Sequence, residues 1–335
     1  MIRAYAATNP KGKLERFDYD PGPLKPGQVE VKVDYCGICH SDLSMLNNDW
    51  GFTQYPFVPG HEIAGTVLEV GEGVTHLKKG DAVGIGWYSG SCLHCRHCMS
   101  GDHNFCAESE GVIVGRHGGF ADKVRAQAAW TLKLPRGVDP AKAGPLFCGG
   151  STVFNPIVQF GVKPTDRVGV IGIGGLGHLA LQFLKHWGCE VTAFSSNPKK
   201  TDEIKKLGAT NVVSSTDVNA IAKLKGALDF ILVTANVPLP WDAILSCLAP
   251  NGRLNIVGAV LEPIPVAAFS LIGGQKTISG SPVGSPSTTA TMLDFCARHN
   301  IAPVVEEFPM SKVNEAMEHL HAGKARYRVV LKAGF

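Results

Sequence analysis

The sequence has no strong excess of charge of either sign. Its 335 residues carry 32 lysines and arginines against 29 aspartates and glutamates, which gives a net charge of +3. A surface that binds nucleic acid or anionic membranes needs a larger basic imbalance. We therefore expect neither a nucleic-acid partner nor a membrane partner.

Long hydrophobic runs are also missing. The longest, VGVIGIGGLGHLALQFL, has 17 residues, five of them glycine, whereas a membrane-spanning helix needs about 20 predominantly apolar residues. The N-terminal stretch MIRAYAATNP has no apolar segment of the kind found in signal peptides. These two features predict a cytoplasmic protein, in which clustered cysteines bind metal more often than they form structural disulfides.

The chain contains no internal repeat and no low-complexity segment, and its length favours two domains. Residues 1–150 are dominated by short stretches such as QVEVKVDYCG, in which apolar and polar residues alternate and glycine ends the stretch. This pattern predicts a compact antiparallel β-barrel.

After residue 150 the pattern changes to strands that alternate with helix-length segments. DRVGVIGIG, CEVTAFSS, LDFILVTA and GRLNIVGAV are buried-strand runs separated by segments such as GLGHLALQFLKHWG. Such alternation predicts βαβ units and a doubly wound parallel sheet, an α/β fold. We expect this second domain over 151–285 and a return of residues 286–335 to the first domain.

A glycine-rich turn follows the first of these strands and opens the next helix. It fits the pattern G-x-G-x-x-G, which in this context binds the pyrophosphate of a dinucleotide at the helix N-terminus. The alternative is an ordinary strand–helix turn. The residues expected to contact the cofactor are Gly172, Gly174, Gly175, Leu176 and Gly177.

The residues at the end of the second strand indicate which dinucleotide the protein binds. A carboxylate at this position binds the ribose 2′-hydroxyl of NAD, but none occurs here before Asp202. Hydroxyl groups and lysines suit the 2′-phosphate of NADPH and NADP⁺ better, although one of these residues could simply cap the next helix. The candidates are Ser195, Ser196, Asn197, Lys199 and Lys200.

Fifteen residues, CLHCRHCMSGDHNFC, contain four cysteines with the spacing C-x₂-C-x₂-C-x₇-C: Cys92, Cys95, Cys98 and Cys106. Four thiolates form a closed tetrahedral zinc site, which supports structure and leaves no position for a substrate. Iron–sulfur runs begin similarly but continue with x₃-C-P. The three histidines among the cysteines are expected to be exposed loop residues.

Catalytic zinc needs three protein ligands and one open position, and three further segments offer cysteine or histidine candidates: CGICHSD, PGHEIAG and PLFCGGSTVF. No local spacing joins Cys39, His61 and Cys148. Each has an ordinary alternative, such as a redox pair of Cys36 with Cys39, a buried histidine or a small buried thiol.

Together, these segments, the four-cysteine run and GIGGLGH resemble the zinc-dependent medium-chain alcohol dehydrogenases in order and spacing, along essentially the whole chain. The resemblance is greatest to the cinnamyl-alcohol-dehydrogenase-like branch and, within it, to bacterial NADPH-dependent aldehyde reductases. It implies a GroES-like β-barrel catalytic domain, a Rossmann domain and two Zn²⁺ ions per chain.

The resemblance also implies residue roles. Cys39, His61 and Cys148 are the catalytic zinc ligands, and Glu62 is a transient ligand. Asp42 orients His61, and Ser41 transfers a proton to or from the substrate oxygen. The remaining implied contacts are Thr152 near the nicotinamide, His40 toward the cofactor phosphates, and Trp50, Trp87 and Tyr88 at the substrate pocket.

One position departs from the pattern of this branch. Many of its members have a histidine where this chain has Ser44. Because serine is no base near neutral pH, either His40 or a water chain must continue the proton relay beyond Ser41.

The sequence thus predicts a zinc- and NADPH-dependent aldehyde reductase, reversible as an alcohol dehydrogenase, acting on medium-chain or aromatic aldehydes. We expect a small-molecule substrate and a homo-oligomer, with a dimer favoured. The alternatives are an NAD-dependent alcohol dehydrogenase working toward oxidation, a dinucleotide-binding protein without catalysis, and an iron–sulfur electron carrier.

Overall fold

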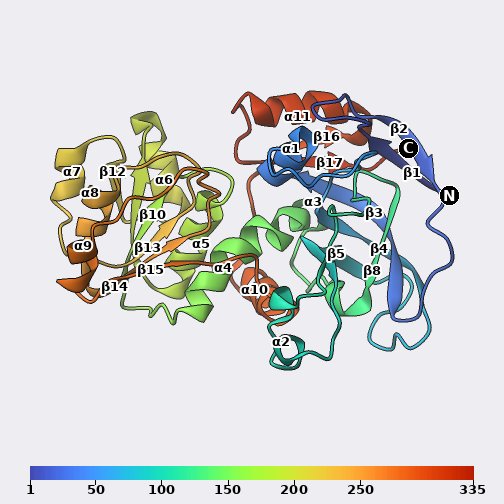
Figure 1. The fold of residues 1–335 in the computed structure, drawn as a ribbon, viewed down its shortest axis with the longest axis horizontal. Coiled ribbons are helices and arrows are strands. Elements are labelled where there is room, and N and C mark those ends of the chain that lie inside the picture. Colours follow the sequence, from blue (N-terminus) through green and yellow to red (C-terminus); the bar gives the residue numbers. More distant parts are fainter. The chain divides into compact units, whose positions relative to one another are not determined.

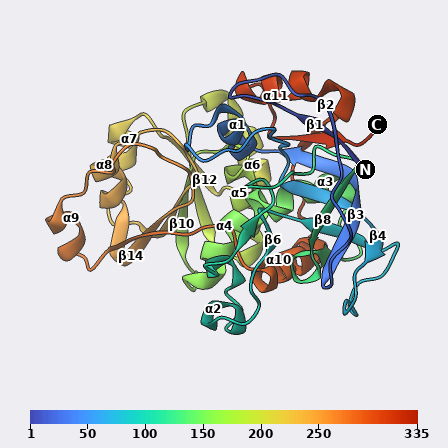
Figure 2. The ribbon, with the colours of Figure 1, turned by 45° about the vertical axis from the view of Figure 1, so that its right-hand side comes forward.

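A computed structural model describes all residues from Met1 to Phe335. The chain forms two compact units, one of Met1–Ser151 with Gly284–Phe335 and the other of Thr152–Val283. Figures 1 and 2 show the ribbon from two directions. None of the helices has the length and apolar character that crossing a membrane requires.

The first unit is built on a seven-stranded sheet around β3 (Gln28–Ile38). β3 pairs with β4 (Glu62–Val70), β8 (Lys123–Gln127) and β17 (Arg328–Lys332), all antiparallel. Val29, Val31 and Val33 lie inside, as the alternating pattern predicts. The sheet is completed by β5 (Ala82–Ile85), β9 (Leu132–Lys133) and β16 (Val305–Pro309).

Short helices and small sheets surround this core. β1 (Ile2–Ala6) pairs with β2 (Glu15–Tyr19), and β6 (Tyr88–Gly90) pairs with β7 (Glu110–Gly111). α1 (His40–Asn47) contacts α11 (Val313–His321), and both views show the two helices side by side (Figures 1 and 2). The other helices of this unit are α2 (Arg96–Met99), α3 (Pro140–Ala143) and α10 (Pro286–His299).

The second unit has a six-stranded parallel sheet in the order β12-β11-β10-β13-β14-β15. This is the doubly wound order of a Rossmann fold, so the predicted fold class is confirmed. α5 and α6 cover one face, and α7, α8 and α9 cover the other (Figure 1). The strands are β10 (Arg167–Ile171), β11 (Glu190–Ser195), β12 (Asn211–Ser214), β13 (Leu228–Val233), β14 (Leu248–Ile256) and β15 (Thr277–Gly280).

Sequence explains where the helices of this sheet begin and end. α5 (Gly177–Trp187) ends at Gly188, whose φ of 109° suits a residue without a side chain. Asp217 caps α7 (Val218–Ala222) by accepting two backbone N–H groups. The other helices are α4 (Gly149–Gln159), which runs from the first unit into the second, α6 (Thr201–Leu207), α8 (Trp241–Ser246) and α9 (Ala268–Ile272).

Candidate active site and metal centres

The first unit gathers Cys39, His61, Glu62 and Cys148 into one buried cluster. One potential ligand atom from each of the four lies within 4.8 Å of the others. Nε2 of His61 is 3.3 Å from Sγ of Cys148, and that sulfur is 4.0 Å from Sγ of Cys39. These residues are far apart in sequence but lie at the ends of neighbouring elements. Cys39 follows the end of β3, His61 and Glu62 lie at the start of β4, and Cys148 directly precedes α4.

Asp42 organises this cluster from α1. Its carboxylate accepts the backbone N–H of Cys39 at 2.9 Å and that of Gly60 at 2.8 Å. Oδ1 also lies 2.9 Å from Nδ1 of His61, and both side chains are fully buried. Because a carboxylate only accepts, Nδ1 carries the proton and Nε2 keeps its lone pair for a metal.

Glu62 lies beside the cluster and forms an ion pair with Arg328 of β17. Oε1 accepts from the guanidinium, whereas Oε2 is buried without a hydrogen-bond partner. Burial raises the pKa of Glu62, and the charge of Arg328 opposes that rise. A buried carboxylate oxygen without a partner normally faces an ion or water, so Oε2 fits a cation beside it.

The two thiols of the cluster differ in acidity. The hydrogen bond from Cys148 holds the pKa of Cys39 well below its usual range, and the same contact raises the pKa of Cys148. Two sulfurs, one imidazole and a spare carboxylate oxygen form a donor set that zinc binds tightly. The cluster therefore fits a zinc ion with an open position.

The cysteine lobe, residues 92–106, contains the second donor cluster. Potential ligand atoms of Cys92, Cys95, Cys98 and Cys106 all lie within 4.8 Å of one another, and Sγ of Cys92 is 4.0 Å from Sγ of Cys98. Tetrahedral zinc with bonds of about 2.3 Å separates its sulfurs by about 3.8 Å. Backbone N–H groups of Cys92 and Cys95 donate to lobe sulfurs, which favours thiolates. The lobe fits a structural zinc ion.

The histidines of the lobe do not all have the predicted environment. His94 and His97 are exposed as expected, but His103 is half-buried with its ring edge against Trp130 at 6.1 Å. That prediction was wrong for His103 because Trp130, outside the lobe, covers it. The sequence gives no local signal for this contact.

Aromatic residues line one side of His61. Trp87 meets the imidazole edge-on with ring centres 5.0 Å apart, and Trp50 meets Trp87 at 6.1 Å. Tyr88 packs instead on Trp130 at 5.1 Å, toward the cysteine lobe. Phe52 is 48% exposed and stacks on Trp50, and the sequence analysis did not single it out.

The other predicted catalytic residues lie on the first turns of two helices. His40 is exposed and Ser41 half-buried at the start of α1, while Thr152 is half-buried in α4. Ser44 lies one turn after Ser41 on α1. Thr152 falls in the second unit and the α1 residues in the first.

The glycine turn of the second unit leaves open space at Gly174 and is tightly packed at Gly172 and Gly177. A Cβ on Gly172 would lie 2.8 Å from the nitrogen of Ala235, and one on Gly177 would lie 2.1 Å from the carbonyl of Gly172. A Cβ on exposed Gly174 would meet nothing within 4 Å. Gly175 and Leu176 lie between, before α5 begins. The turn fits a pyrophosphate at Gly174.

Thr234 supports this turn and was missed by sequence analysis. Its hydroxyl donates to the carbonyls of Gly172 at 2.5 Å and Ile171 at 3.0 Å. The residue follows strand β13, which pairs with β10 in parallel. Its position at the carboxyl end of a neighbouring strand is the signal that could have found it.

At the end of β11, Ser195 and Asn197 form a small turn. The N–H of Asn197 donates to Oγ of Ser195 at 3.2 Å, and Oδ1 of Asn197 accepts from the N–H of Lys199 at 3.0 Å. The expected capping role is thus present in Asn197. Ser196 and Lys199 are exposed, and Lys200 is half-exposed.

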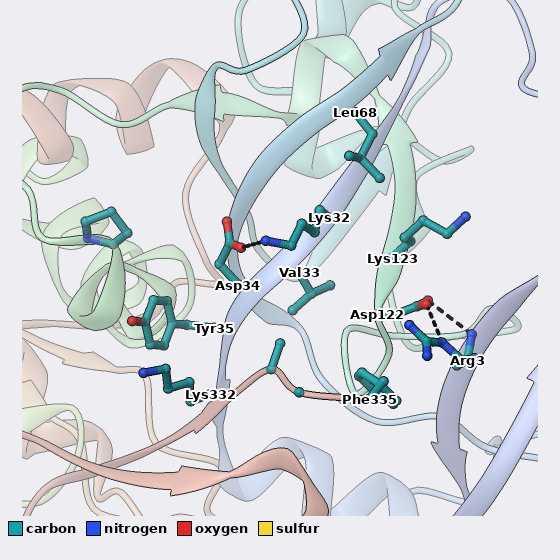
Figure 3. A pocket seen from close by; sticks show the side chains of 13 residues that line it. Arg3, Lys32, Val33, Asp34, Tyr35, Leu68, Asp122, Lys123, Lys332 and Phe335 are labelled. Carbon is teal, nitrogen blue, oxygen red and sulfur yellow. Dashed lines mark hydrogen bonds and ion pairs between the residues drawn. The ribbon is translucent and has the colours of Figure 1, made fainter.

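A separate pocket of about 540 Å³ lies on the first unit near the C-terminus (Figure 3). Its charges are largely paired, with Lys32 bonded to Asp34 at 2.8 Å and Arg3 to Asp122 at 2.9 Å. No predicted site residue lines it. We do not assign the catalytic function to this pocket.

Two family models match the chain. The model described as "Alcohol dehydrogenase GroES-like domain" covers residues 25–136, and "Zinc-binding dehydrogenase" covers residues 175–298. The order of these matches and the two cysteine-containing clusters define a zinc-binding dehydrogenase with a GroES-like domain and a Rossmann domain.

Similar proteins narrow this class. The chain is 57% identical over 331 residues to "Aldehyde reductase AdhA" of Synechocystis sp. (strain PCC 6803), covering 99% of this chain and 98% of the relative. It thus belongs to the zinc-dependent medium-chain alcohol dehydrogenase family, in the cinnamyl-alcohol-dehydrogenase-like branch.

Two solved structures share the whole fold. A cinnamyl alcohol dehydrogenase of Sorghum bicolor aligns with a TM-score of 0.94 and 35% identity, covering 99% of this chain and 97% of that one. A cinnamyl alcohol dehydrogenase of Helicobacter pylori, complexed with NADP(H), aligns with a TM-score of 0.91 and 29% identity, with the same coverage.

Proposed function

We propose that this protein reduces aldehydes to primary alcohols with NADPH at a zinc site formed by Cys39, His61 and Cys148. The single observation that carries the proposal is the buried cluster in which these ligands meet beside Glu62. The similarity to an aldehyde reductase over 99% of the chain supports aldehydes as the substrate class.

The cofactors would supply the chemistry that side chains lack: a zinc ion held by Cys39, His61 and Cys148 would polarise a carbonyl oxygen, and bound NADPH would supply a hydride. Asp42 holds His61 in the tautomer that binds metal. Arg328 neutralises part of the Glu62 charge, so Oε2 of Glu62 would serve as a transient ligand that water or substrate could replace.

Ser41 is the proposed proton donor to the product oxygen, and exposed His40 restores its proton from solvent. Ser44 has no basic group to share this task. Trp50 and Trp87 supply an apolar wall beside His61, which favours medium-chain and aromatic aldehydes. Tyr88 is a weaker candidate for this wall because it packs on Trp130.

NADPH is the proposed dinucleotide because the end of β11 offers Ser195, Ser196 and Lys199 and has no carboxylate. The NADP(H) complex of the Helicobacter pylori relative supports this choice. The pyrophosphate would lie at Gly174, where the backbone is exposed. Thr152 of α4 is the proposed neighbour of the nicotinamide.

The cysteine lobe is proposed to hold the structural zinc, which gives two zinc ions per chain. Thiolate ligands require reducing conditions, so we place the protein in the cytoplasm. We also propose a homodimer through the sheet edge at β15, near which Phe269 and Ile272 are 84% and 68% exposed. Light scattering of the purified protein tests this assembly.

The experiment that tests the function is a side-by-side assay of NADPH and NADH oxidation by benzaldehyde and hexanal, with zinc-replete protein. We expect turnover with both aldehydes and a much higher kcat/KM for NADPH. Faster NADH would favour the NAD-dependent alternative. No turnover with either cofactor would contradict aldehyde reduction.

A further inference from the structure

A third donor group lies at the edge of the cysteine lobe. Potential ligand atoms of Cys92, His94 and Glu108 all lie within 4.8 Å of one another. Sulfur, imidazole and carboxylate are the three ligand types that zinc uses in proteins. We propose that these residues form a capture site, which takes a zinc ion from solvent and passes it to the four-cysteine site through the shared ligand Cys92.

Exposure sets the order in which an arriving ion meets these ligands. Cys98 and Cys106 are each only 4% exposed, while Cys92 and Cys95 are half-exposed and His94 and Glu108 are exposed. An ion from solvent cannot reach the two deep sulfurs first. The capture site lies on the outer side of the lobe and shares one ligand, Cys92, with the four-cysteine site.

The backbone before His94 is shaped to bring its ring back toward Cys92. Leu93 adopts a φ of 65°, in the left-handed region that a leucine rarely enters, and its side chain is 43% exposed. Nδ1 of His94 then lies 2.7 Å from the carbonyl oxygen of Cys92. Burial of the Leu93 side chain does not account for this conformation, because much of it remains in solvent.

That hydrogen bond also prepares His94 as a ligand. A carbonyl oxygen only accepts, so Nδ1 of His94 donates and Nε2 keeps its lone pair. Metal-binding histidines commonly use one ring nitrogen in this way to fix the tautomer and the ring orientation. The hydrogen bond therefore leaves Nε2 as the nitrogen of His94 that can bind a metal.

Transfer needs only stepwise ligand exchange. While Cys92 keeps its bond to the ion, the bonds to His94 and Glu108 break as bonds to Cys95, Cys98 and Cys106 form. Each thiol that binds releases its proton to solvent, and no electron is transferred. The ion never leaves the protein, so transfer avoids full rehydration of the metal.

The inference rests on the proposed zinc site of the cysteine lobe and is independent of the reaction. The test is exchange of ¹¹³Cd²⁺ into the purified holoenzyme, followed by ¹¹³Cd NMR, in which a four-sulfur site gives its own resonance. We compare wild type with His94→Gln, Glu108→Gln and the double variant. His97→Gln is the matched control, because His97 is an exposed histidine of the same lobe outside the donor group.

We expect the four-sulfur resonance to appear about tenfold more slowly in the double variant, the low end of the effect of removing residues that support a metal site. The exchange rate of each single variant should lie between those of wild type and the double variant, and the rate of His97→Gln should match wild type. The catalytic cluster should give a Cd resonance in every protein, and excess ¹¹³Cd²⁺ should add one more resonance in wild type that the double variant lacks. Glu108→Gln leaves the His94 hydrogen bond in place, so it tests the capture site without disturbing the loop.

Equal exchange rates in wild type and the double variant, with no resonance specific to wild type, would overturn the capture site and leave the structural zinc assignment standing. Absence of a four-sulfur resonance from every protein would overturn that assignment and the capture site together. The Tm values of the fully metal-loaded proteins should differ little. Similar Tm values would show that slow exchange in a variant does not result from a damaged fold.

Discussion

Oδ1 of Asp42 lies 2.9 Å from Nδ1 of His61 in a fully buried pair, and the same carboxylate accepts the N–H groups of Cys39 and Gly60. One side chain thus ties together the segments that supply two proposed zinc ligands. A carboxylate suits this role because it accepts several hydrogen bonds and donates none.

Asp42→Asn should weaken zinc binding at the catalytic cluster by about 10- to 100-fold, the usual effect of losing such a support. The new amide NH₂ would face a backbone N–H. This leaves a buried donor without an acceptor, which costs about 1–3 kcal/mol of stability. Dialysis against a graded zinc buffer measures the loss through metal content and activity. Asp49→Asn, on the exposed chain after α1, is the control; equal zinc affinity in both variants would contradict the role of Asp42.

Gly174→Ala and Gly177→Ala should separate cofactor binding from folding. Gly174 has open space where a Cβ would stand, so its variant should keep the wild-type Tm but raise the Kd for NADPH about tenfold. Gly177 has the Gly172 carbonyl 2.1 Å from that position, so its variant should lose several degrees of Tm, at roughly 2–4 °C per kcal/mol. Fluorescence titration and thermal unfolding test this pair. Unchanged NADPH affinity in Gly174→Ala would place the pyrophosphate elsewhere.

Cys106→Ala should mainly lower the stability of the fold, with a smaller effect on the catalytic rate of each folded molecule. It removes one of four ligands from a closed site, and the binding energy of a structural zinc ion contributes directly to folding. Cys296→Ala is the matched control, since it deletes a sulfur that is only 1% exposed and belongs to no donor cluster. We expect a clearly larger fall in Tm for Cys106→Ala. A fall no larger than that of Cys296→Ala would argue against a structural metal.

Asp229→Asn should destabilise the second unit only where the aspartate is ionised. Burial works against the ionised form, but hydrogen bonds from the Arg167 side chain and N–H hold the pKa of Asp229 below its usual range. A lowered folded-state pKa adds stability above the unfolded value of about 3.9, which is lost as pH falls through the folded value. Because the pair is near the surface, the loss at pH 7 should be about 0.5–1 kcal/mol. Urea unfolding at pH 7 and pH 3.5 measures it; a difference that does not shrink at low pH would contradict this origin.

Local patterns in the sequence were enough to predict most strands of the second unit and the helix α5, but not the short helices α7, α8 and α9. β10, β11, β13 and β14 are the buried runs read from DRVGVIGIG, CEVTAFSS, LDFILVTA and GRLNIVGAV. Their signals are short in range, since apolar periodicity and glycine turns depend only on neighbouring residues. The parallel order of the sheet follows from the alternation with helices.

Arg328 shows what local patterns do not reveal. It pairs with Glu62 across 266 positions because β17 pairs antiparallel with β3, with Val329 opposite Ile38. No spacing rule connects these strands. A signal did exist, since an arginine beside Val329, Val330 and Leu331 in a buried strand needs a buried acidic partner. No local pattern joined Cys39, His61 and Cys148 either; the family resemblance identified them, and their roles as ligands are proposals.

The measurement that tests the central claim most directly compares NADPH oxidation by an aldehyde in wild type and Cys148→Ala, with zinc content and NADPH affinity determined on the same samples. We predict that the variant loses one of two zinc ions per chain and at least about a thousandfold in kcat, which corresponds to about 4 kcal/mol of transition-state stabilisation. Its NADPH affinity should stay near wild type, because the glycine turn lies in the other unit. Wild-type turnover in Cys148→Ala would contradict a catalytic zinc held by Cys39, His61 and Cys148.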